Sequence, residues 1–289
     1  MSHVISSSSP GTTALWVAWA RAVENRRADR MFSDDYAAAF LAAADPETGT
    51  PPAEFREALP AVVATRTAFF DEHLNCVTAD GIRQVVLLGA GLDTRAFRLS
   101  WPVGTRLYEL DTPELLAFKE AVLARQGADA NCQRTPLAVD LTDDWPAALC
   151  TAGLDPAQPV AWLAEGLLPY LEAEVADRLL TTVGQLSAPD STLALTYHRP
   201  EALGALAATP RGRHLDRVGV AHPSLPSRPE TWLAHHGWQA NAHDIVDQAV
   251  AHHRAPAAAT QHTGPGTTVC WLVTATLAGR QPQHQAPPP

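Results

Sequence analysis

The chain has 289 residues, a formal net charge of -10, and 46% hydrophobic against 18% charged residues. This balance is typical of a globular protein with a packed core, and the length suits one large domain or two small ones, of which we expect one. The negative charge and the lack of any basic run disfavour nucleic acid and anionic membrane surfaces as partners.

The chain begins with a polar segment and then a helical one. Residues 6–11 are small and polar, and the N-terminal segment 1–12 is expected to be mobile. Apolar spacing predicts helices at 13–26, 34–44 and 53–75. Together they indicate a helical lid over residues 13–80, which precedes the first strand.

Short apolar segments then alternate with helical ones in an α/β core at residues 81–278. Strands are expected at 84–88, 105–110, 134–139, 159–164 and 192–197, and helices at 113–126, 145–151 and 172–187. Repeated βα units predict a doubly wound, mainly parallel sheet with right-handed crossovers.

The pattern breaks at 199–229, which is rich in arginine, histidine and proline and where we expect an insertion or substrate loop. A helix at 229–236 and strands at 238–246 and 267–277 follow, which brings the sheet to seven strands. Residues 279–289 are expected to form a disordered tail, so that 13–278 is a single domain.

The cysteines and histidines do not indicate a metal site. The four cysteines are widely spaced and form no C-x-x-C pair. We therefore expect neither a zinc module nor a disulfide scaffold. The pairs at 235–236 and 252–253 cannot put both imidazoles on one helical face, and no carboxylate accompanies them at zinc-like spacing. No signal-peptide pattern or membrane-length apolar run is present, which favours a cytoplasmic protein.

A glycine turn follows the first expected strand. Gly89 and Gly91 permit a tight turn and the close approach of a ligand, although an ordinary βα connection can look the same. A dinucleotide fingerprint requires a third glycine where this sequence has Thr94, which argues against a pyrophosphate on the helix N-terminus. A nucleoside without phosphates fits better.

Acidic residues end the next two expected strands. Asp111 lies roughly twenty residues after the glycines, where an acid in doubly wound folds binds ribose hydroxyls. It could also cap the following helix, and the two roles are compatible. Asp140 and Leu141 offer a carboxylate and an apolar side chain suited to adenine, while Asp143 or Asp144 could supply the next helix cap.

Several motifs together resemble the leucine carboxyl methyltransferase family over roughly residues 13–197. They are GAGLDTRAFR at 89–98, Glu109-Leu110-Asp111, Asp140-Leu141 with Trp145, and WLAEGLLPYL at 162–171. The resemblance implies the class I methyltransferase fold, which is Rossmann-like, and S-adenosyl-L-methionine as cofactor.

The resemblance also implies roles for single residues. Around the methionine portion of the cofactor, Arg66 would bind the carboxylate and Glu165 would lie near the amino group. Gly89 would pass under this portion, with Gly91 in the same turn. Asp111 would hold the ribose, and Asp140 and Leu141 would hold the adenine. Without the resemblance, an ion pair between Arg66 and Glu165 that ties the lid to the sheet is the simpler interpretation.

Two features depart from the family pattern. Members that methylate a protein C-terminus have an N-terminal lysine at the cofactor, and this sequence has none there, so Arg21 or Arg26 would have to replace it. The end of the fifth strand, Tyr197-His198-Arg199, has no counterpart that we can match.

These three residues are the candidate catalytic ones, because they leave the fifth strand where an acceptor should bind. His198 could act as a general base and Arg199 could anchor a carboxylate, although a solvated loop histidine is the more common outcome.

The expected reaction is methyl transfer to an oxygen of a small molecule or peptide of secondary metabolism. A carboxylate is favoured because it is ionised at neutral pH and needs no base. Methylation of a carbon, nitrogen or hydroxyl group, with or without cyclisation, is the alternative. A NAD-dependent oxidoreductase or a non-catalytic binding module is less favoured, and the oligomeric state is not indicated.

Overall fold

The computed structural model describes residues 10–207, 209–220, 225–252, 254 and 270–277. The first helix begins at Pro10, so residues 10–12 of the expected mobile segment are helical, whereas residues 1–9 and the expected tail at 279–289 lie outside the described residues.

The described strands form one sheet in the order β3-β2-β1-β4-β5-β7-β6. Their bounds are β1 Gln84–Leu88, β2 Arg106–Asp111, β3 Gln133–Ala138, β4 Val160–Ala164, β5 Thr192–His198, β6 Trp238–Asp244 and β7 Cys270–Leu277. Strands β1 to β5 pair in parallel, and β7 is antiparallel to both β5 and β6. The expected sheet of seven strands, mainly parallel, is therefore present.

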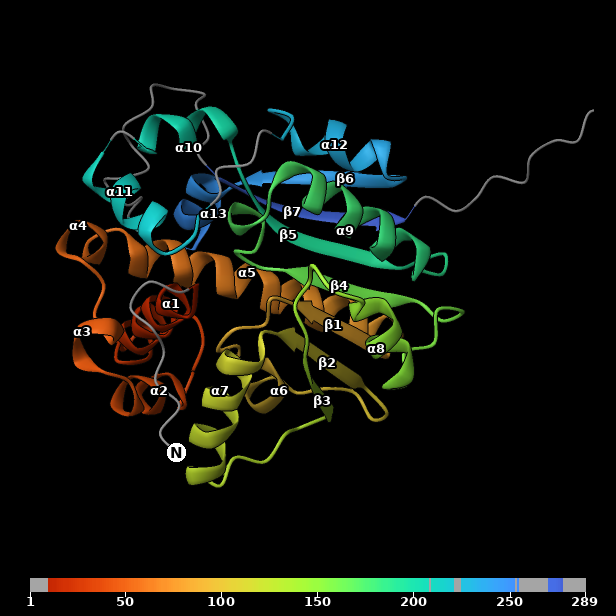
Figure 1. Ribbon diagram of the computed structural model, residues 1–289. Coiled ribbons are helices and arrows are strands. Elements are labelled where there is room, and N and C mark those ends of the chain that lie inside the picture. The colour runs from red at the N-terminus through yellow and green to blue at the C-terminus, as the bar shows by residue number, and fades with distance from the viewer. Residues whose placement is uncertain (1–9, 208, 221–224, 253, 255–269, 278–289) are drawn as a thin grey trace, which may run out of the picture.

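Helices make up the rest of the ordered elements (Figure 1). The lid holds α1 Pro10–Asn25, α2 Ala37–Ala43, α3 Pro46–Gly49, α4 Ala53–Arg56 and α5 Leu59–Ala79. The core holds α6 Arg95–Arg98, α7 Pro113–Arg125, α8 Trp145–Thr151, the 3-10 turn η1 Leu168–Tyr170, α9 Ala173–Gln185, α10 Pro200–Ala207, α11 Pro210–Arg217, α12 Pro229–His235 and α13 Ile245–Ala251.

Three elements differ from the expectation. The expected helix at 53–75 is two helices, because Pro60 has no N–H to donate to the carbonyl group four residues earlier. The expected strand at 238–246 ends at Asp244, whose side chain accepts a hydrogen bond from Val246 N and caps α13. The segment at 199–229, expected to be an insertion or substrate loop, carries the short helices α10 and α11.

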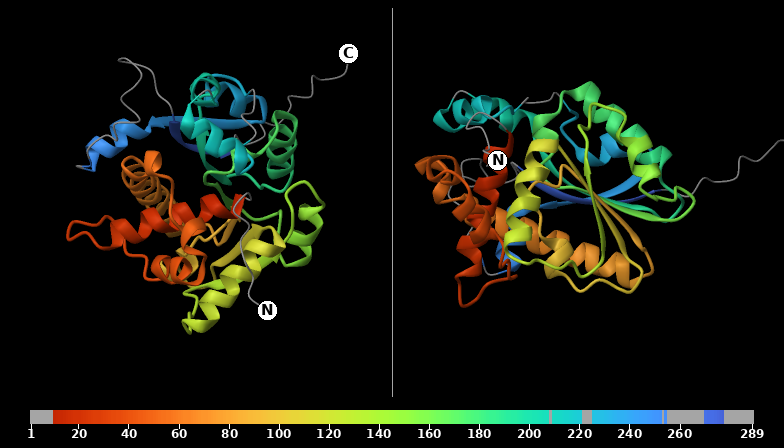
Figure 2. Two further views of the ribbon diagram at one scale, coloured as in Figure 1. Left: turned by 60° about the vertical axis from the view of Figure 1, so that its left-hand side comes forward. Right: turned by 60° about the horizontal axis from the view of Figure 1, so that its bottom comes forward.

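The sheet separates two apolar cores, because successive side chains of a strand point to opposite faces. On one face Val86 packs with residues of α8, α9 and α12, and on the other Val85 packs with residues of α5 and α13. The right-hand view of Figure 2 shows α5 in orange and α9 in green on opposite sides of the sheet. The lid helices α1 and α2 share a third core with α7.

Candidate active site

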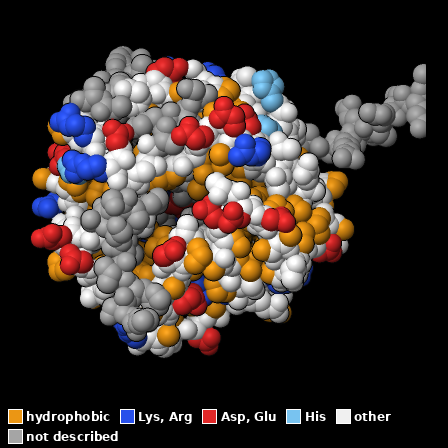
Figure 3. Space-filling view, in the orientation of Figure 1, with side chains coloured by type: hydrophobic (Ala, Val, Ile, Leu, Met, Phe, Trp, Pro, Cys, Tyr) orange, Lys and Arg blue, Asp and Glu red, His pale blue; other side chains and the backbone are white. Residues whose placement is uncertain are grey.

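A cavity of about 410 Å³ lies between the lid and the carboxyl ends of the strands. Its mouth is a hollow near the middle of Figure 3, with acidic side chains beside it. Every predicted cofactor residue lines it, together with one of the three predicted catalytic residues: Arg66, Gly89, Gly91, Asp111, Asp140, Leu141, Glu165 and His198. The structure thus brings these residues together at the edge where doubly wound folds bind ligands.

The glycine turn and Asp111 form one unit. Gly89 and Gly91 have φ angles of +64° and +51°, the left-handed conformation that glycine adopts without steric cost. Asp111 Oδ2 accepts a hydrogen bond from Gly91 N at 2.6 Å, and Oδ1 accepts one from Thr112 N at 2.7 Å. The N-cap of α7 is Thr112, so Asp111 orders the turn and does not cap the helix. Burial raises the pKa of this half-buried carboxyl group.

Asp140 lies at the rim of the cavity, beyond the end of β3. Its Oδ1 accepts hydrogen bonds from Thr142 N at 2.8 Å and from Thr142 Oγ1 at 2.7 Å. The cap of α8 comes from Asp144, which accepts from Ala147 N. Asp140 is therefore not needed as a helix cap, and the half-buried Leu141 follows it in the cavity wall.

An ion-pair network joins the lid to the end of β4. Arg66 Nε donates to Glu165 Oε1 at 2.7 Å, and Arg95 Nη1 lies 2.7 Å from Glu165 Oε2. Burial opposes ionisation of Glu165, but the charges of the two arginines hold its pKa below the usual value. The structure thus contains the ion pair between Arg66 and Glu165 that we considered the simpler interpretation of the sequence. Within the described residues the two Nη groups of Arg66 make no hydrogen bond and can bind an anion.

The N-terminus of α6 is occupied by a carboxylate. Asp93 Oδ1 accepts from Arg95 N at 2.7 Å, and Asp93 lines the cavity. Burial alone would raise its pKa, but the charges of Arg95 and Lys119 lower it to about 2. A pyrophosphate at this helix end would meet a fixed negative charge, which supports the argument drawn from Thr94 against a dinucleotide.

Arg21 of α1 reaches the cavity, whereas Arg26 is exposed. The buried Arg21 donates from Nη2 to the carbonyl of Leu92 at 2.5 Å, and its Nε lies 3.0 Å from Asp34 Oδ2. Of the two arginines expected to replace the family lysine, only Arg21 is in position.

The three predicted catalytic residues separate in the structure. Tyr197 points away from the cavity into the core that contains Val86. Its ring packs there against Trp232 and Trp271, and its hydroxyl donates to the carbonyl of Pro226 at 2.5 Å. It does not line the cavity, because adjacent residues of a strand face opposite sides.

Arg199 does not line the cavity either, and its Nε lies 3.5 Å from Glu201 Oε2 near the surface. His198 alone remains at the cavity. Its Nδ1 is buried and has no hydrogen-bond partner among the described residues. Burial and then the charge of Arg66 lower the pKa of His198 to about 4, so the imidazole is neutral at pH 7.

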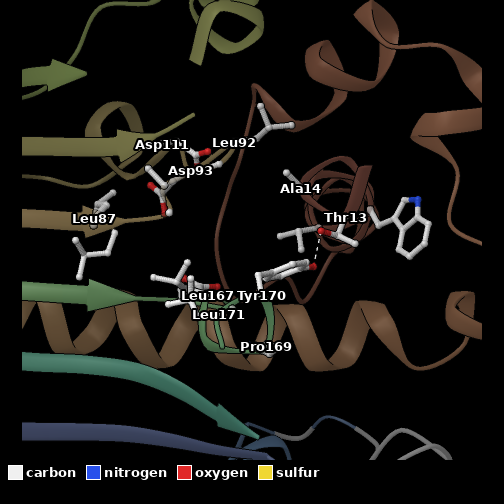
Figure 4. Close-up of a pocket in the computed structure, with 18 of the residues that line it drawn as sticks. Thr13, Ala14, Leu87, Leu92, Asp93, Asp111, Leu167, Pro169, Tyr170 and Leu171 are labelled. Atoms are coloured by element: carbon white, nitrogen blue, oxygen red, sulfur yellow. Dashed lines mark hydrogen bonds between the residues drawn. The ribbon is translucent and has the colours of Figure 1, made fainter. Parts of the chain in front are cut away.

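The sequence interpretation missed a contact that closes the cavity from the lid side. Thr13 Oγ1 and Tyr170 Oη are 2.6 Å apart and join α1 to η1, as the dashed line in Figure 4 shows. Tyr170 belongs to the WLAEGLLPYL segment quoted above, but only its hydrogen bond to Thr13 of α1 indicates this role. Apolar cavity residues from four helices were also missed: Trp16, Phe55, Leu203 and Leu215.

Neither a metal-binding cluster nor a membrane-spanning helix occurs among the described residues. No group of three or more histidine, cysteine or acidic side chains there could hold a metal ion. No helix in the described part of the chain is long and apolar enough to cross a membrane.

Comparisons with known proteins agree with these features. The family model described as leucine carboxyl methyltransferase matches residues 14–184. A Streptomyces coelicolor protein provisionally named an S-adenosyl-L-methionine-dependent methyltransferase is 43% identical over 262 residues, which cover 88% of this chain and 92% of that protein. A Frankia alni protein with the same provisional name is 47% identical over 234 residues, 79% of this chain and 83% of that one.

Solved structures show the same fold. A Streptomyces avermitilis protein of a family without assigned function has a TM-score of 0.58 at 19% identity and covers 92% of this chain and 97% of its own. A Thermobifida fusca protein, provisionally a methyltransferase, has a TM-score of 0.56 at 17% identity and covers 86% and 90%. The predicted Rossmann-like α/β fold with an N-terminal helical region is thus confirmed.

Proposed function

Because the chain belongs to the leucine carboxyl methyltransferase family and is an S-adenosyl-L-methionine-dependent methyltransferase, we propose that it methylates a carboxylate oxygen of a small acceptor. The observation that carries this proposal is the state of His198. It is a half-buried, neutral imidazole in the cavity wall, with its Nδ1 atom buried.

The cavity fits the cofactor. The left-handed Gly89 has no Cβ, and an added Cβ would lie 3.0 Å from Leu167 Cδ1. A side chain at this position would therefore fill the space beside the glycine turn. Asp111 is the acceptor for ribose hydroxyl groups, and the Nη groups of Arg66 are the donors for the carboxylate. Asp140 and Leu141 would hold the adenine. Once bound, the cofactor supplies an electrophilic methyl group.

The side chains of the protein would act mainly by positioning. Glu165 uses both carboxylate oxygens on Arg66 and Arg95 and so holds the guanidinium of Arg66 toward the cavity. In-line displacement on a methyl group depends above all on the alignment of the two reactants, which such fixed groups provide.

His198 is better suited to a carboxylate than to a hydroxyl acceptor. A base with a pKa of about 4 is a weak proton acceptor, and no acidic side chain among the described residues pairs with it to strengthen it. A carboxylate needs no deprotonation at neutral pH. The neutral imidazole can donate one hydrogen bond to it, and the positive charge of Arg66 acts at the same place.

A second candidate is methylation of a hydroxyl group. The observation in its favour is the buried Nδ1 of His198, which lacks a partner among the described residues and could accept the hydroxyl proton. This candidate requires His198 to work as a general base.

Two measurements separate the candidates once turnover is found with a panel of carboxylic acids and phenols. A methyl ester is hydrolysed in alkali, whereas a methyl ether is not. His198→Ala should keep the rate within about tenfold for a carboxylate but lower it about a hundredfold or more for a hydroxyl acceptor. A large loss with a basic limb in the pH–rate profile, together with an alkali-stable product, would overturn the carboxylate proposal.

A further inference from the structure

The polarity of the cavity changes along the edge of the sheet. At the β3 and β2 side its wall holds Asp140, Asp111 and Thr112, and near β1 and β4 it holds the ion pair of Arg66 and Glu165. These polar groups match a nucleoside joined to an amino acid. Beyond them, at the β5 side, the wall becomes apolar.

We define the β5 end of the cavity by six lining residues: Trp16, Phe55, His198, Leu203, Leu215 and Val220. Trp16, Leu203 and Val220 are buried, with exposed fractions of 6%, 6% and 9%. Apart from His198 and the indole N–H of Trp16, these side chains carry no polar atom. The β5 end therefore offers apolar contact and few hydrogen bonds.

Helices from both halves of the chain build this end. The ring centroids of Trp16 and Phe55 are 5.3 Å apart, and Phe55 in turn lies edge-on to His214 of α11 at 6.4 Å. His214 Nδ1 lies 2.8 Å from Glu54 Oε1, which holds α11 against α4. Figure 1 shows α4, α11 and α10 on the same side of the molecule, next to the end of β5.

The space is small. A volume of about 410 Å³ is near the lower limit of the roughly 300 to 1,000 Å³ usual for ligand sites, and it has to hold the cofactor as well. A peptide would bring an N–H and a C=O group for each residue, and each buried group without a partner weakens binding. The apolar wall provides no set of partners for them.

We propose that the acceptor is a small molecule with an aliphatic or aromatic body, which fills the β5 end and presents one oxygen to His198. The inference rests on the proposed function, since it names the substrate class of the same site. It excludes peptides and sugar acids, whose polar groups would be left unpaired beside Phe55 and Leu203.

The first test measures binding of acids to the protein saturated with S-adenosylhomocysteine. In calorimetry with butanoate, pentanoate, hexanoate and octanoate, affinity should rise about fourfold for each added methylene until the space is filled. Glucuronate and a dipeptide ending in leucine should bind at least tenfold more weakly than hexanoate. Equal affinity along the series, or tighter binding of the dipeptide, would overturn the inference.

The second test compares two buried leucines of the segment after β5. Leu203→Ala should weaken octanoate binding about tenfold and leave S-adenosylhomocysteine binding unchanged, because Leu203 lines the β5 end. Leu225→Ala is the matched control, since Leu225 belongs to the same core as Val86 and does not line the cavity. If Leu203→Ala does not fold, Phe55→Leu replaces it. Equal effects of the two leucine variants would contradict the inference.

The outcomes keep the two proposals apart. An apolar acceptor that is methylated on a hydroxyl oxygen would refute the proposed carboxylate chemistry and leave this inference standing. A polar acid converted into an alkali-labile methyl ester, with the apolar acids inert, would do the reverse.

Discussion

Arg66 of α5 and Glu165 after β4 are 99 residues apart in the sequence, yet Arg66 Nε donates to Glu165 Oε1 at 2.7 Å. The two side chains are only 11% and 14% exposed. This pair joins the lid to the sheet and also fixes the guanidinium at the cavity. Structural and ligand-binding roles therefore coincide in the same residues.

Replacement of Arg66 should separate these roles. Arg66→Ala should weaken binding of S-adenosylhomocysteine about tenfold or more and leave adenosine binding nearly unchanged, because adenosine has no carboxylate for the guanidinium. Calorimetry with both ligands measures the difference. Arg26→Ala, an exposed change at the end of α1, is the control. Equal losses for both ligands would show that Arg66 only holds the lid in place.

Asp111→Ala should weaken cofactor binding by about 1.5 to 3 kcal/mol, the usual effect of losing hydrogen bonds to a charged group. The loss has two sources, the ribose contact and the bond from Gly91 N that orders the turn. The control is Asp144→Ala, which removes the cap of α8 outside the cavity and should lower stability only. A folded Asp111→Ala variant with unchanged affinity would contradict the assignment.

Gly89→Ala should both destabilise the fold and block the cofactor. The left-handed φ of +64° costs a side chain about 1 to 2 kcal/mol, and the added Cβ would lie 3.0 Å from Leu167 Cδ1. Gly104→Ala has the same kind of strain, with a φ of +83°, but its Cβ would meet no atom within 4 Å. Urea unfolding should show a loss in both variants, and cofactor binding should fail only in the first. A normal affinity of Gly89→Ala for the cofactor would argue against a close approach of the cofactor to the glycine turn.

Stability should decrease in mild acid because two half-buried histidines resist protonation in the folded state. Burial lowers the pKa of His73 to about 4 from the ordinary 6.5. As the pH falls below 6.5, the unfolded chain binds a proton that the folded chain does not bind until about pH 4. The stabilisation is thus complete above 6.5 and is lost as the pH falls toward 4, by about 2 kcal/mol at pH 5 for each such histidine.

His198 shares this property, but His73 lies outside the cavity and is the better test. Urea unfolding of His73→Leu at pH 7 and pH 5 should show a pH dependence that is smaller by about 2 kcal/mol than that of the wild type. His235→Leu is the control, because the side chain of His235 is exposed. An unchanged pH dependence in His73→Leu would mean that His73 does not resist protonation in the folded state.

The sequence by itself determined the local elements and the edge of the sheet that carries the site. Apolar periodicity placed the strands within a few residues, and the glycine turn with Asp111 indicated a nucleoside site, because these signals depend only on neighbours along the chain. The interruption at Pro60 and the cap at Asp244 were also readable in principle, since both act within four residues.

The tertiary structure decided which candidate residues share a space. Tyr197 and His198 are adjacent in the sequence, but the direction of β5 sends one into the core with Trp232 and the other into the cavity. From the sequence, Arg21 and Arg26 were equal candidates to replace the family lysine. The packing of α1 distinguishes them, because it places Arg21 in contact with Leu92. Contacts between distant segments depend on how helices and strands pack, and no local pattern in one sequence encodes that geometry.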